Sequence, residues 1–208
     1  MVTGQQILST IAAFDVRGAR LNHVQVRGEA KTFFTSAQAL LAPVAAKETA
    51  IRADGTLNVK ERKTELAKLL PNIHSALAGA ISDKTRIDQR LDRLTRELHT
   101  LPLSANEPVL RQLKNAELRG IMRTLTQAER VSMLSEAVKT NDVNVLDAFT
   151  SAPDALVPRE VQQRAVASWA ESRKPDAWTE AEAVGEVAGA LGALITQTHG
   201  WVRSLETE

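Results

Sequence analysis

The chain has 208 residues, which is enough for one large or two small domains with a buried core. Hydrophobic residues make up 43% and aromatic residues only 3%, so the apolar side chains suit helix–helix packing and leave few rings for a base-stacking or sugar-binding surface. A net charge of +1 gives no overall cation excess to attract nucleic acid, and the absence of Cys excludes disulfides, thiolate metal sites and a Cys nucleophile.

The first predicted element is a helix that extends to about residue 22. Its apolar residues Ile7, Ile11, Phe14 and Leu21 follow a roughly helical stripe. Residues 21–26 also fit a short extended piece, so an N-terminal helix or arm is expected over residues 1–28. The chain lacks the basic start and apolar core of a signal peptide, and no apolar stretch is long enough to span a bilayer. We therefore expect a soluble protein that does not enter a membrane.

A helical hairpin is predicted over residues 29–101. Its first helix, residues 29–53, has apolar residues at helical spacing, and Pro43 is expected to kink or split it. A turn follows, in which Gly55 is able to take the left-handed cap conformation. Asn58 and Glu61 have the spacing of a capping box, which starts the next helix.

The longest periodic stretch runs from residue 59 to 101, with a kink expected at Pro71. Beyond this proline, apolar residues recur at alternating three- and four-residue steps, as they do in a coiled-coil seam. The candidate interaction residues on this seam are Ile73, Leu77, Ile87, Leu91, Leu94 and Leu98. Two arrangements remain open: a coiled-coil-like stalk with the preceding helix packed antiparallel, or an ordinary amphipathic helix in a bundle.

Residues 102–208 are predicted to form a compact bundle of shorter helices, which completes an all-α fold. Capping boxes are expected at Ser104 with Glu107, Thr126 with Glu129, and Thr179 with Glu182. Residues 141–142 are expected to start a short helix that ends before Pro153. Pro158 is expected to open the next helix, which ends at Pro175. The last helix is predicted over residues 180–205, where Gly185, Gly189 and Gly192 favour tight packing inside the fold.

No residue pattern matches a catalytic, cofactor or metal site. The His residues have no second His nearby in the sequence, and no phosphate-binding loop or nucleophile elbow occurs. Residues 128–149 have the lengths of a helix-turn-helix, but the second helix offers Asp142, Asn144 and Asp147 without a Lys or Arg, which would repel DNA. We therefore expect no enzyme activity, no cofactor and no metal ion.

Two segments resemble helical proteins found among the structural and assembly genes of tailed bacteriophages. They are the Ala-Asp-Gly-Thr-Leu turn at residues 53–57 and the pair of short helices at residues 116–153, which ends in Ala-Pro. The resemblance implies a structural or assembly component of a virion, found in the virion and in the host cytoplasm during assembly. Expected partners are further copies of the chain or other virion proteins. The alternative is a packaging or regulatory protein that contacts nucleic acid without sequence specificity.

Overall fold

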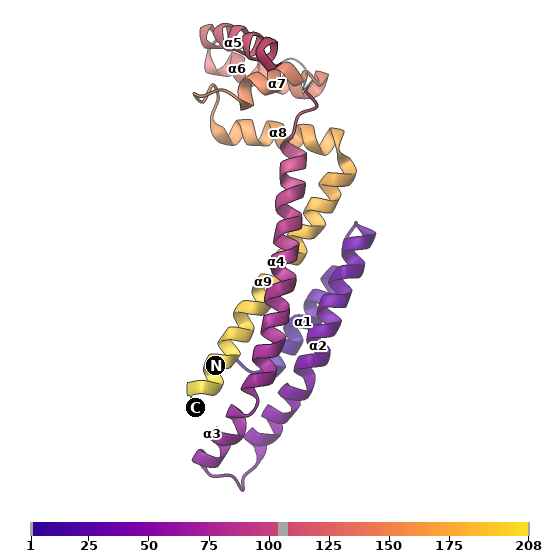
Figure 1. The fold of residues 1–208 in the computed structure, drawn as a ribbon, viewed down its shortest axis with the longest axis vertical. Coiled ribbons are helices and arrows are strands. Elements are labelled where there is room, and N and C mark those ends of the chain that lie inside the picture. Colours follow the sequence, from indigo (N-terminus) through magenta and orange to yellow (C-terminus); the bar gives the residue numbers. More distant parts are fainter. Residues whose placement is uncertain (1, 104–107, 208) are drawn as a thin grey trace. The chain divides into compact units, whose positions relative to one another are not determined.

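The computed structural model describes residues 2–103 and 108–207, and every regular element within these ranges is an α-helix (Figure 1). The helices are α1 (Gly4–Gly18), α2 (Val24–Ala53), α3 (Val59–Ala67), α4 (Leu70–His99), α5 (Pro108–Thr124), α6 (Gln127–Thr140), α7 (Val143–Thr150), α8 (Arg159–Arg173) and α9 (Pro175–Thr207). The prediction of an all-α fold is confirmed.

The chain divides into two compact units, which differ from the predicted ranges 1–28, 29–101 and 102–208. Unit 1 comprises Met1–Arg93 and Thr179–Glu208, and unit 2 comprises Leu94–Trp178. The difference arises because most of α9 returns to the N-terminal helices and buries its apolar face among them. The buried residues of that face include Val184, Val187, Leu191, Trp201 and Leu205. Order along the chain does not reveal such a return.

In unit 1, α1 packs antiparallel against α2. The amide of Gly4, at the start of α1, donates a hydrogen bond of 2.8 Å to Glu48, which lies near the end of α2. The contact around Gly4 is so close that a Cβ atom there would lie 2.6 Å from the Cβ of Ala45 and 2.8 Å from Cζ2 of Trp201. This position therefore requires glycine, and it brings α1, α2 and α9 together.

Helix α4 has two neighbours in unit 1, α2 and α9. Nη1 of Arg90 donates to both carboxylate oxygens of Glu29 on α2 at 2.9 Å, and its Nε donates to Glu180 on α9 at 2.8 Å. The guanidinium of Arg86 lies 5.2 Å from the ring centroid of Phe33, also on α2. One guanidinium on α4 thus joins α2 and α9, and a coiled-coil stalk is not confirmed.

Several helix ends lie where local chemistry predicts them. The capping boxes at Asn58 and Thr126 are both formed, with the expected glutamates as partners. Asn141 ends α6 with a φ of 60°, in the left-handed region, and Asp142 caps α7. Pro158 precedes α8 as expected. The capping box predicted at Ser104 lies outside the described residues.

Other boundary predictions are corrected by the structure. Helix α2 is continuous through Pro43, because buried residues on both sides hold it against the bundle. Pro71 lies in the first turn of α4, where a proline costs little, because a break between α3 and α4 precedes it. No described glycine has a positive φ, and Asp54, rather than Gly55, organises its turn by accepting from the amide of Thr56.

The prediction of a helix end at Pro175 is correct for α8, but the start predicted for the next helix is wrong. Helix α9 begins at Pro175 itself, so Thr179 lies inside the helix and does not cap it with Glu182. Proline fits the first position of a helix because its missing N–H has no intrahelical partner there. A single residue, Lys174, thus separates α8 from α9.

Unit 2 is organised around the short helix α7, which contacts α5, α6 and α8. Five consecutive residues of α7, from Val145 to Phe149, are buried. Lys174, which follows α8, donates to the carbonyl oxygens of Glu97 and Thr100 and so ties the end of α8 to the end of α4. Helix α7 is therefore the core of this unit, and the longer helices cover it.

Candidate interaction surface on helix α5

The candidate interaction residues chosen from the sequence lie on α4, and they are largely covered within the chain. Ile73, Leu77, Ile87, Leu94 and Leu98 are buried, and Leu91 is half-buried. The structure thus places all six along the inward side of one helix and leaves little of their surface for another chain. A surface for partners has to be sought elsewhere in the described residues.

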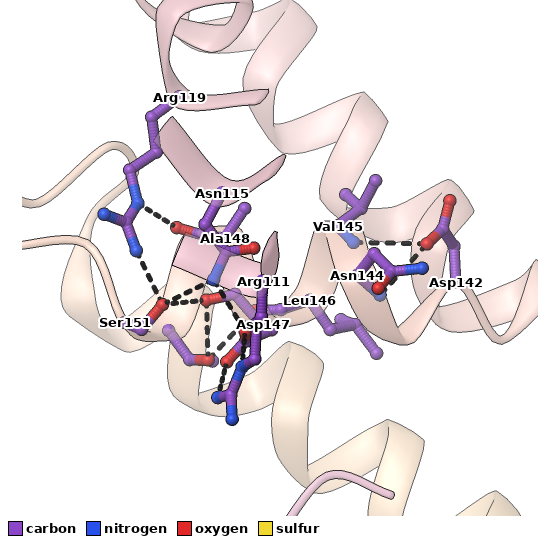
Figure 2. A network of polar contacts seen from close by, with 11 residues as sticks. Arg111, Asn115, Arg119, Asp142, Asn144, Val145, Leu146, Asp147, Ala148 and Ser151 are labelled. Atoms are coloured by element: carbon purple, nitrogen blue, oxygen red, sulfur yellow. Dashed lines mark hydrogen bonds and ion pairs between the residues drawn. The ribbon is translucent and has the colours of Figure 1, made fainter. Parts of the chain in front are cut away.

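Helix α5 turns polar side chains toward the core helix α7 (Figure 2). Nε and Nη2 of Arg111 donate to the two carboxylate oxygens of Asp147 at 2.6 and 2.7 Å, and Asn115 donates to the same carboxylate at 2.6 Å. Asp147 is only 3% exposed. A buried carboxylate with three donors is satisfied, and it holds α5 in one orientation.

The environment of Asp147 keeps its carboxyl ionised. Burial raises its pKa, but the hydrogen bonds from Arg111 and Asn115 and the positive charges of Arg111 and Arg119 together lower it by more, so the pKa of Asp147 lies below its ordinary value. The hydrogen bond with Asp147 raises the pKa of Arg111, with burial opposing it. Both charges are therefore present at neutral pH.

A third residue extends this polar stripe along α5. Arg119 donates to the carbonyl oxygen of Ala148 at 3.1 Å and to Oγ of Ser151 at 2.7 Å (Figure 2). Because Arg111, Asn115 and Arg119 are spaced four residues apart, they lie on the same face of the helix. The whole length of that face is directed at α7 and the turn after it.

The opposite face of α5 carries large apolar side chains in solvent. Val109 is 68% exposed, Leu110 43%, Leu113 63% and Ile121 50%. A surface helix ordinarily directs its apolar stripe at the core and its polar face at water. On α5, Met122 is buried, but Leu110, Leu113 and Ile121 face solvent while Arg111, Asn115 and Arg119 bind α7 and the turn after it. Grouped exposed apolar side chains mark sites of interaction more often than isolated ones do. This outward face, defined by Leu110, Leu113 and Ile121, is the candidate interaction surface.

The glycines of α9 do not all pack as predicted. A Cβ atom on Gly185 or Gly189 would meet nothing within 4 Å, so the prediction of tight packing is wrong at these two positions. At Gly192 an added Cβ would lie 3.3 Å from Cε of Lys84, which is a close contact with α4. The spacing of the three glycines therefore does not mark a single contact face.

Unit 1 has a groove beside Gly189, between α1, α2 and α9. Its floor is apolar and includes Phe14, Phe34 and Val187, while Arg17 and Glu186 lie at its edge. The missing side chain of Gly189 helps to leave this space open. The groove offers an apolar surface but no buried polar group to orient a small ligand. It is therefore better suited to hold an apolar side chain than to bind a substrate.

The acidic residues that argued against DNA binding have structural roles. Asp142 accepts hydrogen bonds from the amides of Asn144 and Val145 at 3.1 Å and caps α7 (Figure 2). Asp147 is buried against Arg111. Sequence reasoning missed this pair. Two features of the sequence indicated it: polar residues recur every four positions on α5, and the predicted short helix has an acid in its middle.

Within the described ranges 2–103 and 108–207, no three His, Asp or Glu side chains are grouped so that they could hold a metal ion. None of the helices described is both long enough and apolar enough to cross a membrane. The outward face of α5 is thus the feature that most needs a functional explanation. No protein family, curated protein or solved structure was found to match this chain.

Proposed function

We propose that this chain is a structural or assembly component of a bacteriophage virion and that it acts through protein–protein contacts. The outward apolar face of α5 supports the contact role. The bacteriophage setting rests on the resemblance of residues 53–57 and 116–153 to virion and assembly proteins. In this proposal the chain is located in the virion, and in the host cytoplasm during assembly.

The orientation of α5 is the reason for assigning its outer face to a partner. A helix serving only its own fold gains stability by burying Leu110, Leu113 and Ile121. Turning α5 over to do so would take Arg111 away from Asp147 and leave a buried carboxylate without its cation, which is strongly unfavourable. The polar pair therefore holds the apolar face outward, where another protein can cover it.

The nucleic-acid alternative receives less support from the arginines of α4. Arg90 is bound to Glu29 and Glu180, and Arg86 contacts Phe33 and pairs with Asp83 at 3.2 Å. Cations already held by carboxylates release fewer counterions from a phosphate backbone, so they add less to binding. We therefore keep protein–protein contact as the proposed activity.

The test measures whether the chain is present in virus particles and assembly intermediates. A tagged chain is expressed in infected host cells, particles and assembly intermediates are separated on a density gradient, and the tag is quantified in each fraction. Leu113→Glu places a charge on the outward face and should remove the chain from these fractions. Gln112→Glu adds the same charge at an exposed neighbour on the other side of the helix and should leave it there. Absence of the unmodified chain from every particle and intermediate would refute the proposal.

A further inference from the structure

We propose that the outward face of α5 binds a second copy of this chain, with the two α5 helices antiparallel about a two-fold axis at the level of Asn115 and Ala116. This inference rests on the proposed contact role of the same face and names its partner. It follows from the order of apolar and charged residues along α5. When two copies of this helix lie antiparallel, apolar residues face apolar residues and each lysine faces a glutamate.

The apolar residues match across such an axis. In an antiparallel pair, residues equally distant from the axis on either side face each other, and each contact occurs twice. Leu110 lies as far before the midpoint of Asn115 and Ala116 as Ile121 lies after it. Leu110 of one copy therefore faces Ile121 of the other, at both ends of the contact, and Leu113 lies beside the line of contact.

The charges match in the same register. Lys114 and Glu117 are equally distant from the same midpoint, so each lysine faces the glutamate of the other copy. Both side chains are exposed, and neither forms an ion pair with another described residue. Two lysine–glutamate contacts at the centre of an apolar strip favour association and fix its direction.

Neighbouring registers are disfavoured by the same charges. Moving the axis to the level of Glu117 would place two carboxylates opposite each other, and moving it to Lys114 would oppose two ammonium groups. A parallel pair would bring like charges together at both positions. Unfavourable alternatives of this kind give an interface its specificity. The sequence of α5 thus selects the antiparallel register through repulsion as well as attraction.

The pairing leaves the rest of unit 2 undisturbed. Arg111, Asn115 and Arg119 lie on the opposite face and keep their partners on and after α7. A single helix from each copy makes an interface at the small end of the range for specific complexes. We therefore expect a dimer that forms reversibly and depends on protein concentration.

Charge reversal tests the inference directly. Sedimentation velocity of the full chain over a wide concentration range should show a monomer–dimer equilibrium. Lys114→Glu and Glu117→Lys should each weaken the dimer by on the order of tenfold, because each replaces two attractive contacts with two repulsive ones. The chain carrying both substitutions should dimerise like the unmodified protein, and an equal mixture of the two single variants should form heterodimers. Circular dichroism checks that every variant keeps its helix content, as expected at exposed positions.

Each outcome is decisive. A strictly monomeric unmodified chain overturns the inference, and so does a dimer whose stability is unchanged by both single reversals. Weakening by the single reversals without recovery in the double variant overturns the antiparallel register. The particle test separates this inference from the proposed function: a monomer that still enters particles removes only the pairing, and a dimer found in no particle or intermediate removes only the virion role.

Discussion

Replacing Asp147 with Ala tests whether the polar pair between α5 and α7 holds unit 2 together. The substitution removes the acceptor for Asn115, which is buried, and for Arg111, whose side chain is 43% exposed. Asn115 then keeps only the longer hydrogen bond of 3.3 Å that it donates to Oγ of Ser151, and a buried amide that loses its shorter bond costs about 1–3 kcal/mol. The exposed guanidinium can bind water, so its contribution is taken as no more than about 1 kcal/mol. We expect Asp147→Ala to lower the free energy of unfolding by roughly 2–3 kcal/mol.

The assay is thermal and urea unfolding followed by circular dichroism, with Asp154→Ala as a matched control. Asp154 pairs with Arg123 at 3.0 Å, but both side chains are exposed, so its loss should cost little. For a unit the size of unit 2, a loss of 2–3 kcal/mol corresponds to a fall in Tm of roughly 10–20 °C. Equal melting of Asp147→Ala and Asp154→Ala would refute the reasoning.

The pH dependence gives a second measure of the same pair. The pKa of Asp147 in the folded protein lies below its ordinary value: burial raises it, but the hydrogen bonds from Arg111 and Asn115 and the charges of Arg111 and Arg119 together lower it by more. Its stabilising effect should therefore be complete above the ordinary Asp pKa and should disappear as the pH falls through the lower, folded pKa. The difference in stability between the unmodified chain and Asp147→Ala should be constant near neutral pH and shrink in acid. A difference that keeps its full size in strong acid would contradict this account.

Three further substitutions test packing at single residues, each measured by urea unfolding. Gly4→Ala should lower the free energy of unfolding by about 1–3 kcal/mol, because the new Cβ would lie 2.6 Å from the Cβ of Ala45. Stability equal to that of the unmodified chain would contradict this close contact. Gly189→Ala should instead raise the free energy of unfolding by about 0.5–1 kcal/mol, because its Cβ meets nothing within 4 Å and alanine favours a helix interior. A lower free energy of unfolding would mean that this space is filled. Asn141→Ala should cost about 2 kcal/mol, since it strains the left-handed φ of 60° and removes the 2.8 Å hydrogen bond that Trp169 donates to the Asn141 side chain; an unchanged midpoint would exclude both effects.

Sequence reasoning identified structure that depends on residues close together in the chain. The capping boxes at Asn58 and Thr126 join residues three positions apart, and the break at residues 141–142, where a short helix was expected to start, also depends on adjacent residues. Such signals are complete within a short window, so the all-α class and most helix ends could be predicted. Even so, local reasoning misplaced the start of α9, because Pro175 ends one helix and begins another.

Contacts between distant residues account for what sequence reasoning missed. Arg90 binds partners 61 and 90 residues away, and no local pattern identifies Glu29 or Glu180 among the other acids. On α5, periodicity alone suggests that Leu113 faces a core, and only the pairing of Arg111 with Asp147 shows that it faces water. The candidate surface was therefore not predicted, because the exposure of its residues depends on a contact with a distant part of the chain.

The division of the chain into units bears on the order in which the protein is made. Unit 1 is discontinuous: residues from Thr179 onward complete it, and all of Leu94–Trp178 lies between its two parts. During synthesis, unit 2 is therefore whole while the N-terminal helices still lack α9. Gly4, which packs closely against both Ala45 and Trp201 in the finished fold, emerges long before that tryptophan exists. Until then the parts of α1 and α2 that α9 covers stay exposed, and a premature stop in α9 would damage the N-terminal bundle rather than the unit that immediately precedes the stop.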